Sequence, residues 1–191
     1  MSQNYNNSST SGVRADNSVF DNYKKAIPKD NLSMNKFLSE IKTKTVAINH
    51  YIDSIEQPFS RKFLTRKRTY VLNKEATNHL RKFTNNYVIV AFSAEWCKDC
   101  AANIPVLALI SEATRLEVRI FRGLKKDPLS RTRKWRIPPS PPEVETFHVD
   151  KIPLIILFDM EGREIGRIIE NPSREPILEE ELLRIILEKH Q

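Results

Sequence analysis

The chain has 191 residues, of which 40% are hydrophobic, and a formal net charge of +7 at pH 7. This length suits one hydrophobic core with extensions, and no run approaches the roughly 18 apolar residues that a membrane-spanning helix needs. The N-terminal sequence has neither the apolar core nor the cleavage site of a secretory signal, so we expect a cytoplasmic protein with no membrane partner.

The N-terminal part of the chain divides into two predicted regions. Residues 1–30 are rich in Asn, Ser, Asp and Lys with few large apolar side chains, so we expect a disordered tail that cannot repay the entropy of ordering. From Ser33 to Gln57, apolar residues recur at steps of three, four and seven. This pattern predicts one amphipathic helix, or two in succession, packed on the core that follows. We assign residues 31–71 to a helical extension and 72–191 to the main domain.

The first half of the main domain has the pattern of a strand–helix–strand unit. A helix predicted at 72–83 precedes a strand at 87–93, whose consecutive apolar residues are typical of a strand buried on both faces. A helix pattern over 101–116, which contains Pro105, leads to a second buried-type strand at 116–121. Two such strands joined by a helix predict a parallel pair.

The second half begins with a basic segment, 123–149, that holds four prolines within five positions and therefore favours extended or turn structure. Residues 152–159 form a third apolar run. Gly162 follows in the turn of a predicted antiparallel hairpin, whose second strand is 164–169. The C-terminal residues have a helical pattern of apolar side chains, with Ser173 as the candidate N-cap.

The only two cysteines, Cys97 and Cys100, lie where the strand at 87–93 gives way to a helix. An isolated C-x-x-C in a chain without a secretory signal is more often reactive or metal-binding than a structural staple. Unpaired backbone N–H groups and the helix dipole at such a junction lower a thiol pKa from about 8.5 into a range of roughly 3.5–7.5. We therefore expect Cys97 to attack disulfides and Cys100, one helical turn later, to resolve the product.

Four features occur in a characteristic order along the chain. They are the motif Trp96-Cys97-Lys98-Asp99-Cys100 after an apolar strand, Pro105 eight residues beyond the first cysteine, Ile152-Pro153 at the opening of a strand, and the Gly162 hairpin. Together they resemble the thioredoxin family over about residues 72–191. The W-C-x-D-C form, with the following N-I-P-V-L-A, is similar to a bacterial and archaeal branch of thioredoxin-like proteins with an N-terminal helical extension.

The resemblance implies an α/β thioredoxin fold, in which a central mixed β-sheet is flanked by helices. It also implies that Pro153 is cis and faces the cysteine pair. The main chain of Ile152 would pair with an extended substrate segment, and Trp96 would be a further substrate-binding residue. The implied activity is thiol–disulfide oxidoreductase, acting on protein or small-molecule disulfides. It needs an unidentified electron donor and no cofactor beyond the redox-active disulfide.

One departure from the family concerns proton transfer. Ala91 stands where many thioredoxins have a buried aspartate, so the usual proton acceptor for Cys100 is missing. Glu95 and Asp99 are the nearest carboxylates in the sequence and are our candidates for proton transfer through water. A negative charge at the start of a helix is also simply favourable to the helix dipole, so this assignment stays open.

Two other kinds of function also stay open. A redox-silent binding module would use the basic clusters, which are Arg61 to Arg68 and the set Lys125, Lys126, Arg131, Arg133, Lys134 and Arg136, to engage an acidic protein or nucleic acid. No nucleic-acid motif accompanies them. Zinc normally needs four ligands, and the two cysteines and four histidines have no zinc-finger spacing, so we predict no metal site. We interpret His148 as a loop residue.

Overall fold

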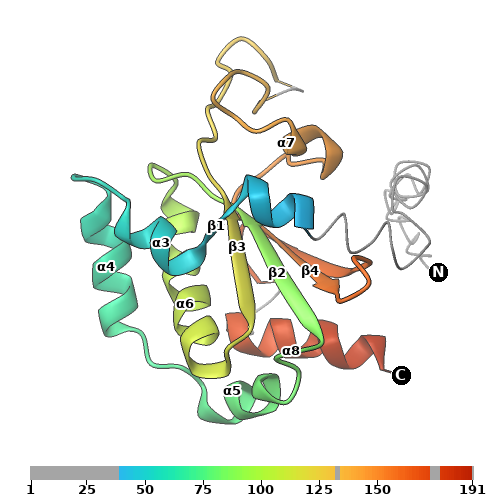
Figure 1. The fold of residues 1–191 in the computed structure, drawn as a ribbon. Helices are drawn as coiled ribbons and strands as arrows, with labels where there is room; N and C mark the ends of the chain where they lie inside the picture. The colour runs from blue at the N-terminus through green and yellow to red at the C-terminus, as the bar shows by residue number, and fades with distance from the viewer. Residues whose placement is uncertain (1–38, 132–133, 173–176, 191) are drawn as a thin grey trace, which may run out of the picture.

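The computed structural model describes residues 39–131, 134–172 and 177–190, and within them the chain forms one five-stranded sheet in the order β1-β3-β2-β4-β5 (Figure 1). Strand β2 runs parallel to β3 and antiparallel to β4, while β1 and β5 form the two antiparallel edges. The predicted mixed sheet is therefore confirmed. The strands are β1 (Val46–Ala47), β2 (Tyr87–Phe92), β3 (Glu117–Phe121), β4 (Leu154–Asp159) and β5 (Glu164–Ile169).

Helices flank this sheet. The long helix α6 follows β2 directly, α4 packs on α6, and α5 packs against both α6 and α8. The loop that carries the short helix α7 extends beyond one end of the sheet (Figure 1). The helices are α3 (Ile48–Asp53), α4 (Ser60–Thr69), α5 (Lys74–Arg81), α6 (Lys98–Thr114), α7 (Glu143–Thr146) and α8 (Leu178–Lys189). The predicted N-cap Ser173 lies outside the described residues, and Ile177 occupies the N-cap position of α8.

The two central strands explain the continuous apolar runs of the sequence. Every residue of β2 and of β4 is buried, because each strand has a neighbour on both edges and is covered on both faces. The Phe92 ring stacks on Phe121 of β3 with a centroid distance of 4.5 Å. The end of β2, which leads to the cysteines, is therefore buried between β3 and β4.

The N-terminal segment joins this core, as the amphipathic stripe predicted. Residues 39–44 are helical and are followed by β1 and α3, and Ile48, Tyr51 and Ile52 of α3 are buried. The two-residue strand β1 was not predicted, because its pairing with β3 is a long-range contact that leaves no local pattern. Residues before the predicted boundary at 71/72 thus supply part of the sheet and of the core, while the predicted tail lies outside the described residues.

A buried carboxylate connects two helix starts. Asn73 caps α5 by accepting hydrogen bonds from the N–H groups of Glu75 and Ala76. The fully buried Glu179 of α8 accepts hydrogen bonds from the Asn73 N–H at 3.0 Å and from the Tyr70 hydroxyl at 2.9 Å. These contacts hold α5 against α8, and therefore stabilise the helical layer that also includes α6.

Candidate active site

Cys97 is the N-cap residue of α6 and lies directly beyond the end of β2. Its backbone is extended, with φ −76° and ψ 125°, and its Sγ accepts a hydrogen bond from the Cys100 N–H at 3.1 Å. A sulfur thus takes the place of the oxygen that Ser, Thr or Asp supplies at most helix starts. The negative form of this sulfur is favoured by the backbone donors and by the helix dipole.

The two sulfurs have opposite environments. Cys97 is 7% exposed, whereas Cys100 is completely buried. A hydrogen bond from the Cys100 thiol, supported by the N–H groups of Cys100 and Asp99, lowers the pKa of Cys97 despite its partial burial. Burial raises the pKa of the Cys100 thiol, and the adjacent Cys97 sulfur raises it further. The pair therefore favours a thiolate at Cys97 and a thiol at Cys100.

The Ile152–Pro153 loop packs against Cys97. The peptide bond between these two residues is cis, as the family resemblance implied. Cys97 Sγ lies 3.4 Å from the Ile152 carbonyl oxygen, to which the protonated thiol donates a hydrogen bond. The structure thus brings the carbonyl group of Ile152, which precedes Pro153, to the Cys97 sulfur. Contact of Ile152 or Pro153 with a substrate stays a prediction.

Trp96 lies at the surface beside Cys97 and is 47% exposed. Its ring stacks on Trp135, with centroids 5.9 Å apart. Trp135 is itself buried, and its Nε1 donates a hydrogen bond to the Asp150 carbonyl oxygen at 3.1 Å. The basic, proline-rich loop therefore forms one wall of the site. Sequence reasoning missed Trp135, because a single tryptophan in an irregular segment carries no periodic signal.

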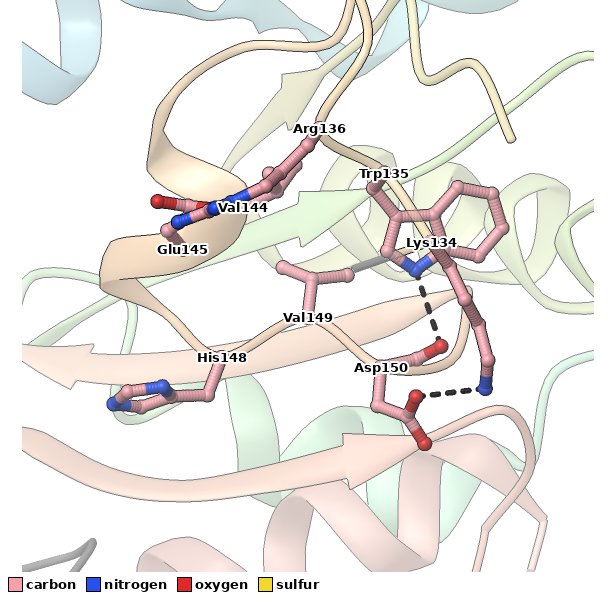
Figure 2. Close-up of a pocket in the computed structure, with 8 residues that line it drawn as sticks. All are labelled: Lys134, Trp135, Arg136, Val144, Glu145, His148, Val149 and Asp150. Carbon is pink, nitrogen blue, oxygen red and sulfur yellow. Dashed lines mark hydrogen bonds and ion pairs between the residues drawn. The ribbon is translucent and has the colours of Figure 1, made fainter. Parts of the chain in front are cut away.

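This loop contains a cavity of about 480 Å³. Figure 2 shows the residues that line it, which are Lys134, Trp135, Arg136, Val144, Glu145, His148, Val149 and Asp150. Two cations of the second basic cluster, Lys134 and Arg136, form ion pairs with carboxylates of the same loop. Lys134 Nζ lies 2.7 Å from an Asp150 carboxylate oxygen, and Arg136 forms an ion pair with Glu145. His148, which has a φ of 52°, lines the cavity near the cis-proline loop.

The structure separates the two predicted proton-transfer carboxylates. Glu95 lines a second cavity of about 250 Å³ together with Tyr51, Trp96 and Lys125. The Asp99 carboxylate accepts a hydrogen bond from the Asn171 side chain at 3.4 Å. In the part of the chain that the structure describes, neither carboxylate hydrogen-bonds to a cysteine sulfur. Their role in proton transfer stays a prediction.

Different polar groups surround Cys100. Ala91 is completely buried in β2, in keeping with the absent aspartate. Burial raises the pKa of the Cys100 thiol, and hydrogen bonding by the Ala94 N–H and the Ser93 hydroxyl, both beyond the end of this strand, opposes that rise. The Tyr51 hydroxyl of α3 lies 3.0 Å from Ser93 Oγ. Sequence reasoning missed these groups; the one signal was a serine directly after an apolar strand, four residues before Cys97.

Among the described residues, no group of three or more His, Cys, Asp or Glu side chains is arranged to hold a metal ion. Within the same residues, none of the helices combines the length and the apolar character that crossing a membrane requires.

The fold and the site together define a class: α/β proteins with a C-x-x-C pair at the start of a helix and a cis-proline loop against the first sulfur. The family model described as Thioredoxin matches residues 45–179, and the chain belongs to the thioredoxin family. The match begins at the short edge strand, within the segment predicted as a helical extension. The finer resemblance, to a W-C-x-D-C branch, stays a prediction.

Curated relatives agree with this assignment. A thioredoxin of Chlamydia muridarum is 31% identical over 114 residues, which cover 60% of this chain and 92% of the relative. A thioredoxin of Chlamydia trachomatis is 29% identical over the same length and coverage. The cysteine pair and these relatives indicate a redox-related protein.

Solved structures confirm the fold. A protein of unknown function from Pseudomonas aeruginosa, PA1234, superposes with a TM-score of 0.60 at 16% identity and covers 79% of this chain and 97% of its own. An HIV epitope scaffold gives a TM-score of 0.60 at 15% identity, with 78% and 97% covered. At these identities the likeness concerns the fold alone.

Proposed function

We propose that this chain is a thiol–disulfide oxidoreductase that reduces protein disulfides, with Cys97 as the nucleophile and Cys100 as the resolving cysteine. The observation that carries the proposal is the asymmetry of the pair. The pKa of Cys97 is lowered and the residue is 7% exposed, whereas the pKa of Cys100 is raised and the residue is completely buried. The thiolate is the attacking form in disulfide exchange, so this arrangement favours Cys97 for the first step.

The reaction has two exchange steps. The Cys97 thiolate attacks one sulfur of the substrate disulfide, a mixed disulfide forms, and the other substrate sulfur leaves and takes up a proton. The Cys100 sulfur then attacks Cys97 Sγ, and its proton goes to the second departing substrate sulfur. The substrate gains two electrons and two protons, and Cys97 and Cys100 become a disulfide. An external dithiol, the unidentified electron donor, must reduce this disulfide for the next cycle.

The surroundings of Cys97 support an extended protein segment as the substrate. The Ile152 main chain contacts the Cys97 sulfur, and Trp96, the residue before Cys97, has a half-exposed ring. Main-chain pairing tolerates many sequences, whereas an aromatic ring contributes apolar contact area. We take the cytoplasm as the compartment, where a reducing glutathione pool suits a reductant.

An insulin reduction assay with dithiothreitol as the electron donor tests the proposal. The wild-type chain should accelerate precipitation of the insulin B chain, and Cys97→Ser should abolish the acceleration. Cys100→Ser should accumulate a mixed disulfide that Cys97→Ser does not form. Equal trapping by both variants, or no acceleration by the wild type, would contradict the proposed mechanism.

The alternative, a redox-silent binding module, has weaker support. Part of the basic cluster in α4 is engaged within the fold, since Lys67 pairs with Glu112 at 2.7 Å. Arg66 lies over the Tyr70 ring and donates a hydrogen bond to the Ala102 carbonyl oxygen. Binding of a polyanion that falls steeply with salt and persists in a Cys97→Ser, Cys100→Ser double variant would favour this alternative.

A further inference from the structure

Two buried hydroxyl groups lie next to the resolving cysteine. Tyr51 of α3 and Ser93, the residue after β2, both have no exposed surface, and their oxygens are 3.0 Å apart. Burial raises the pKa of the Cys100 thiol, and the Ser93 hydroxyl opposes this rise as a hydrogen-bond donor. A polar contact therefore connects α3, in the N-terminal part of the fold, to a residue that acts on the Cys100 thiol.

The chemistry of the groups fixes the direction of these hydrogen bonds. A thiolate accepts hydrogen bonds and donates none, so Ser93 must donate its only hydroxyl proton to Cys100 whenever that sulfur carries charge. The Ser93 oxygen then accepts the proton of the Tyr51 hydroxyl. Burial raises the pKa of the Tyr51 phenol above its usual range, so this donor keeps its proton while the cysteines titrate. The Ala94 N–H is a second hydrogen-bond donor that opposes the rise that burial causes in the pKa of the Cys100 thiol.

The proposed reaction needs such donors at its second step. Negative charge must develop on Cys100 as it attacks Cys97, and burial opposes this charge. The strand position that holds an acidic residue in many thioredoxins is Ala91 here. Of the two nearby carboxylates, that of Glu95 belongs to a residue that lines a cavity, and that of Asp99 accepts a hydrogen bond from Asn171.

We propose that the Ser93 hydroxyl and the Ala94 N–H form a donor site that stabilises the developing charge on Cys100, and that Tyr51 is a positioning residue that orients the Ser93 hydroxyl. This inference rests on the proposed function, because it concerns the resolving step. In that step the Cys100–Cys97 sulfur bond forms and the bond from Cys97 to the substrate sulfur breaks. The Cys100 proton passes to the departing substrate sulfur, so no additional reactant is needed.

A single-turnover reaction with dithiobis(nitrobenzoate) separates the two steps. The first equivalent of nitrothiolate reports attack by Cys97, and the second reports attack by Cys100. In Ser93→Ala, the first phase should stay within about twofold of wild type. The second phase should slow about tenfold, and the pH midpoint of its rate should rise by about one unit. Both changes are the size expected when one hydrogen bond to a charged group is lost.

Tyr51→Phe keeps the ring and its edge-to-face contact with Phe63 and removes only the hydroxyl. It should slow the second phase about threefold, which is less than the effect of Ser93→Ala because Tyr51 only orients the Ser93 hydroxyl. In the Ser93→Ala background it should have no further effect, because Tyr51 acts through Ser93. The matched control is Tyr87→Phe, which removes a β2 hydroxyl that bonds to His190 at 2.8 Å and should leave both phases unchanged.

The pH profile distinguishes a charge effect from a loss of packing, because the titratable groups around the site, Cys97, Glu95 and Asp99, stay in place in every variant. An unchanged second phase in Ser93→Ala at all pH values, or full additivity of the two substitutions, would overturn the inference. If Ser93→Ala does not fold, the Tyr51→Phe profile decides. If the wild type releases both equivalents of nitrothiolate but does not reduce insulin, only the proposed function is refuted. If it releases one equivalent, the proposed function and the inference about the resolving step are both refuted.

Discussion

The largest contribution that lowers the pKa of Cys97 is the hydrogen bond from the Cys100 thiol, and Cys100→Ala removes this donor alone. The Cys100 N–H, 3.1 Å from Cys97 Sγ, belongs to the backbone and stays in place. A hydrogen bond to a charged group contributes about 1.5–3 kcal/mol, which corresponds to a rise of roughly 1–2 units in the pKa of Cys97. We expect Cys100→Ser, which keeps a hydroxyl donor, to show a smaller rise.

The pKa is measured from the pH dependence of alkylation by iodoacetamide and from the ultraviolet absorbance of the thiolate. In the wild type, the alkylation rate should rise with pH and level off below the ordinary thiol pKa of about 8.5. In Cys100→Ala the plateau should move to higher pH. If this variant levels off at or below the wild-type pH, the Cys100 thiol is not what stabilises the thiolate, and the reasoning about the pair is wrong.

Two further predictions concern the stability of the scaffold. Glu179→Ala leaves the partly buried Tyr70 hydroxyl and the Asn73 N–H without their acceptor, and should lower the free energy of unfolding in urea by about 2–4 kcal/mol. An unchanged midpoint would contradict this. Gly166→Ala places a Cβ 2.5 Å from Ile185 Cγ2, and should lower the free energy of unfolding by about 1–3 kcal/mol through overpacking of β5 against α8. A higher melting temperature would contradict this and would show that α8 can shift to make room.

Much of the sheet and one part of the site were determined by local sequence. The apolar runs at 87–93 and 152–159 became the two central strands, because a strand covered on both faces needs apolar residues at every position. The junction of strand and helix set Cys97 at an N-cap, because backbone donors at a helix start are a local property. The proline opposite the sulfur followed only from the family resemblance, since an X-Pro dipeptide alone favours the trans form.

Tertiary structure decided what lies around the cysteines. Tyr51 and Ser93 are 42 residues apart, and Trp96 meets Trp135 across a loop without periodicity. The sequence placed Glu95 and Asp99 near Cys100 by number alone, whereas the fold turned them toward a cavity and Asn171. Local patterns record which face of an element is buried. They do not record which distant side chain meets it, because that depends on how separate elements pack against one sheet.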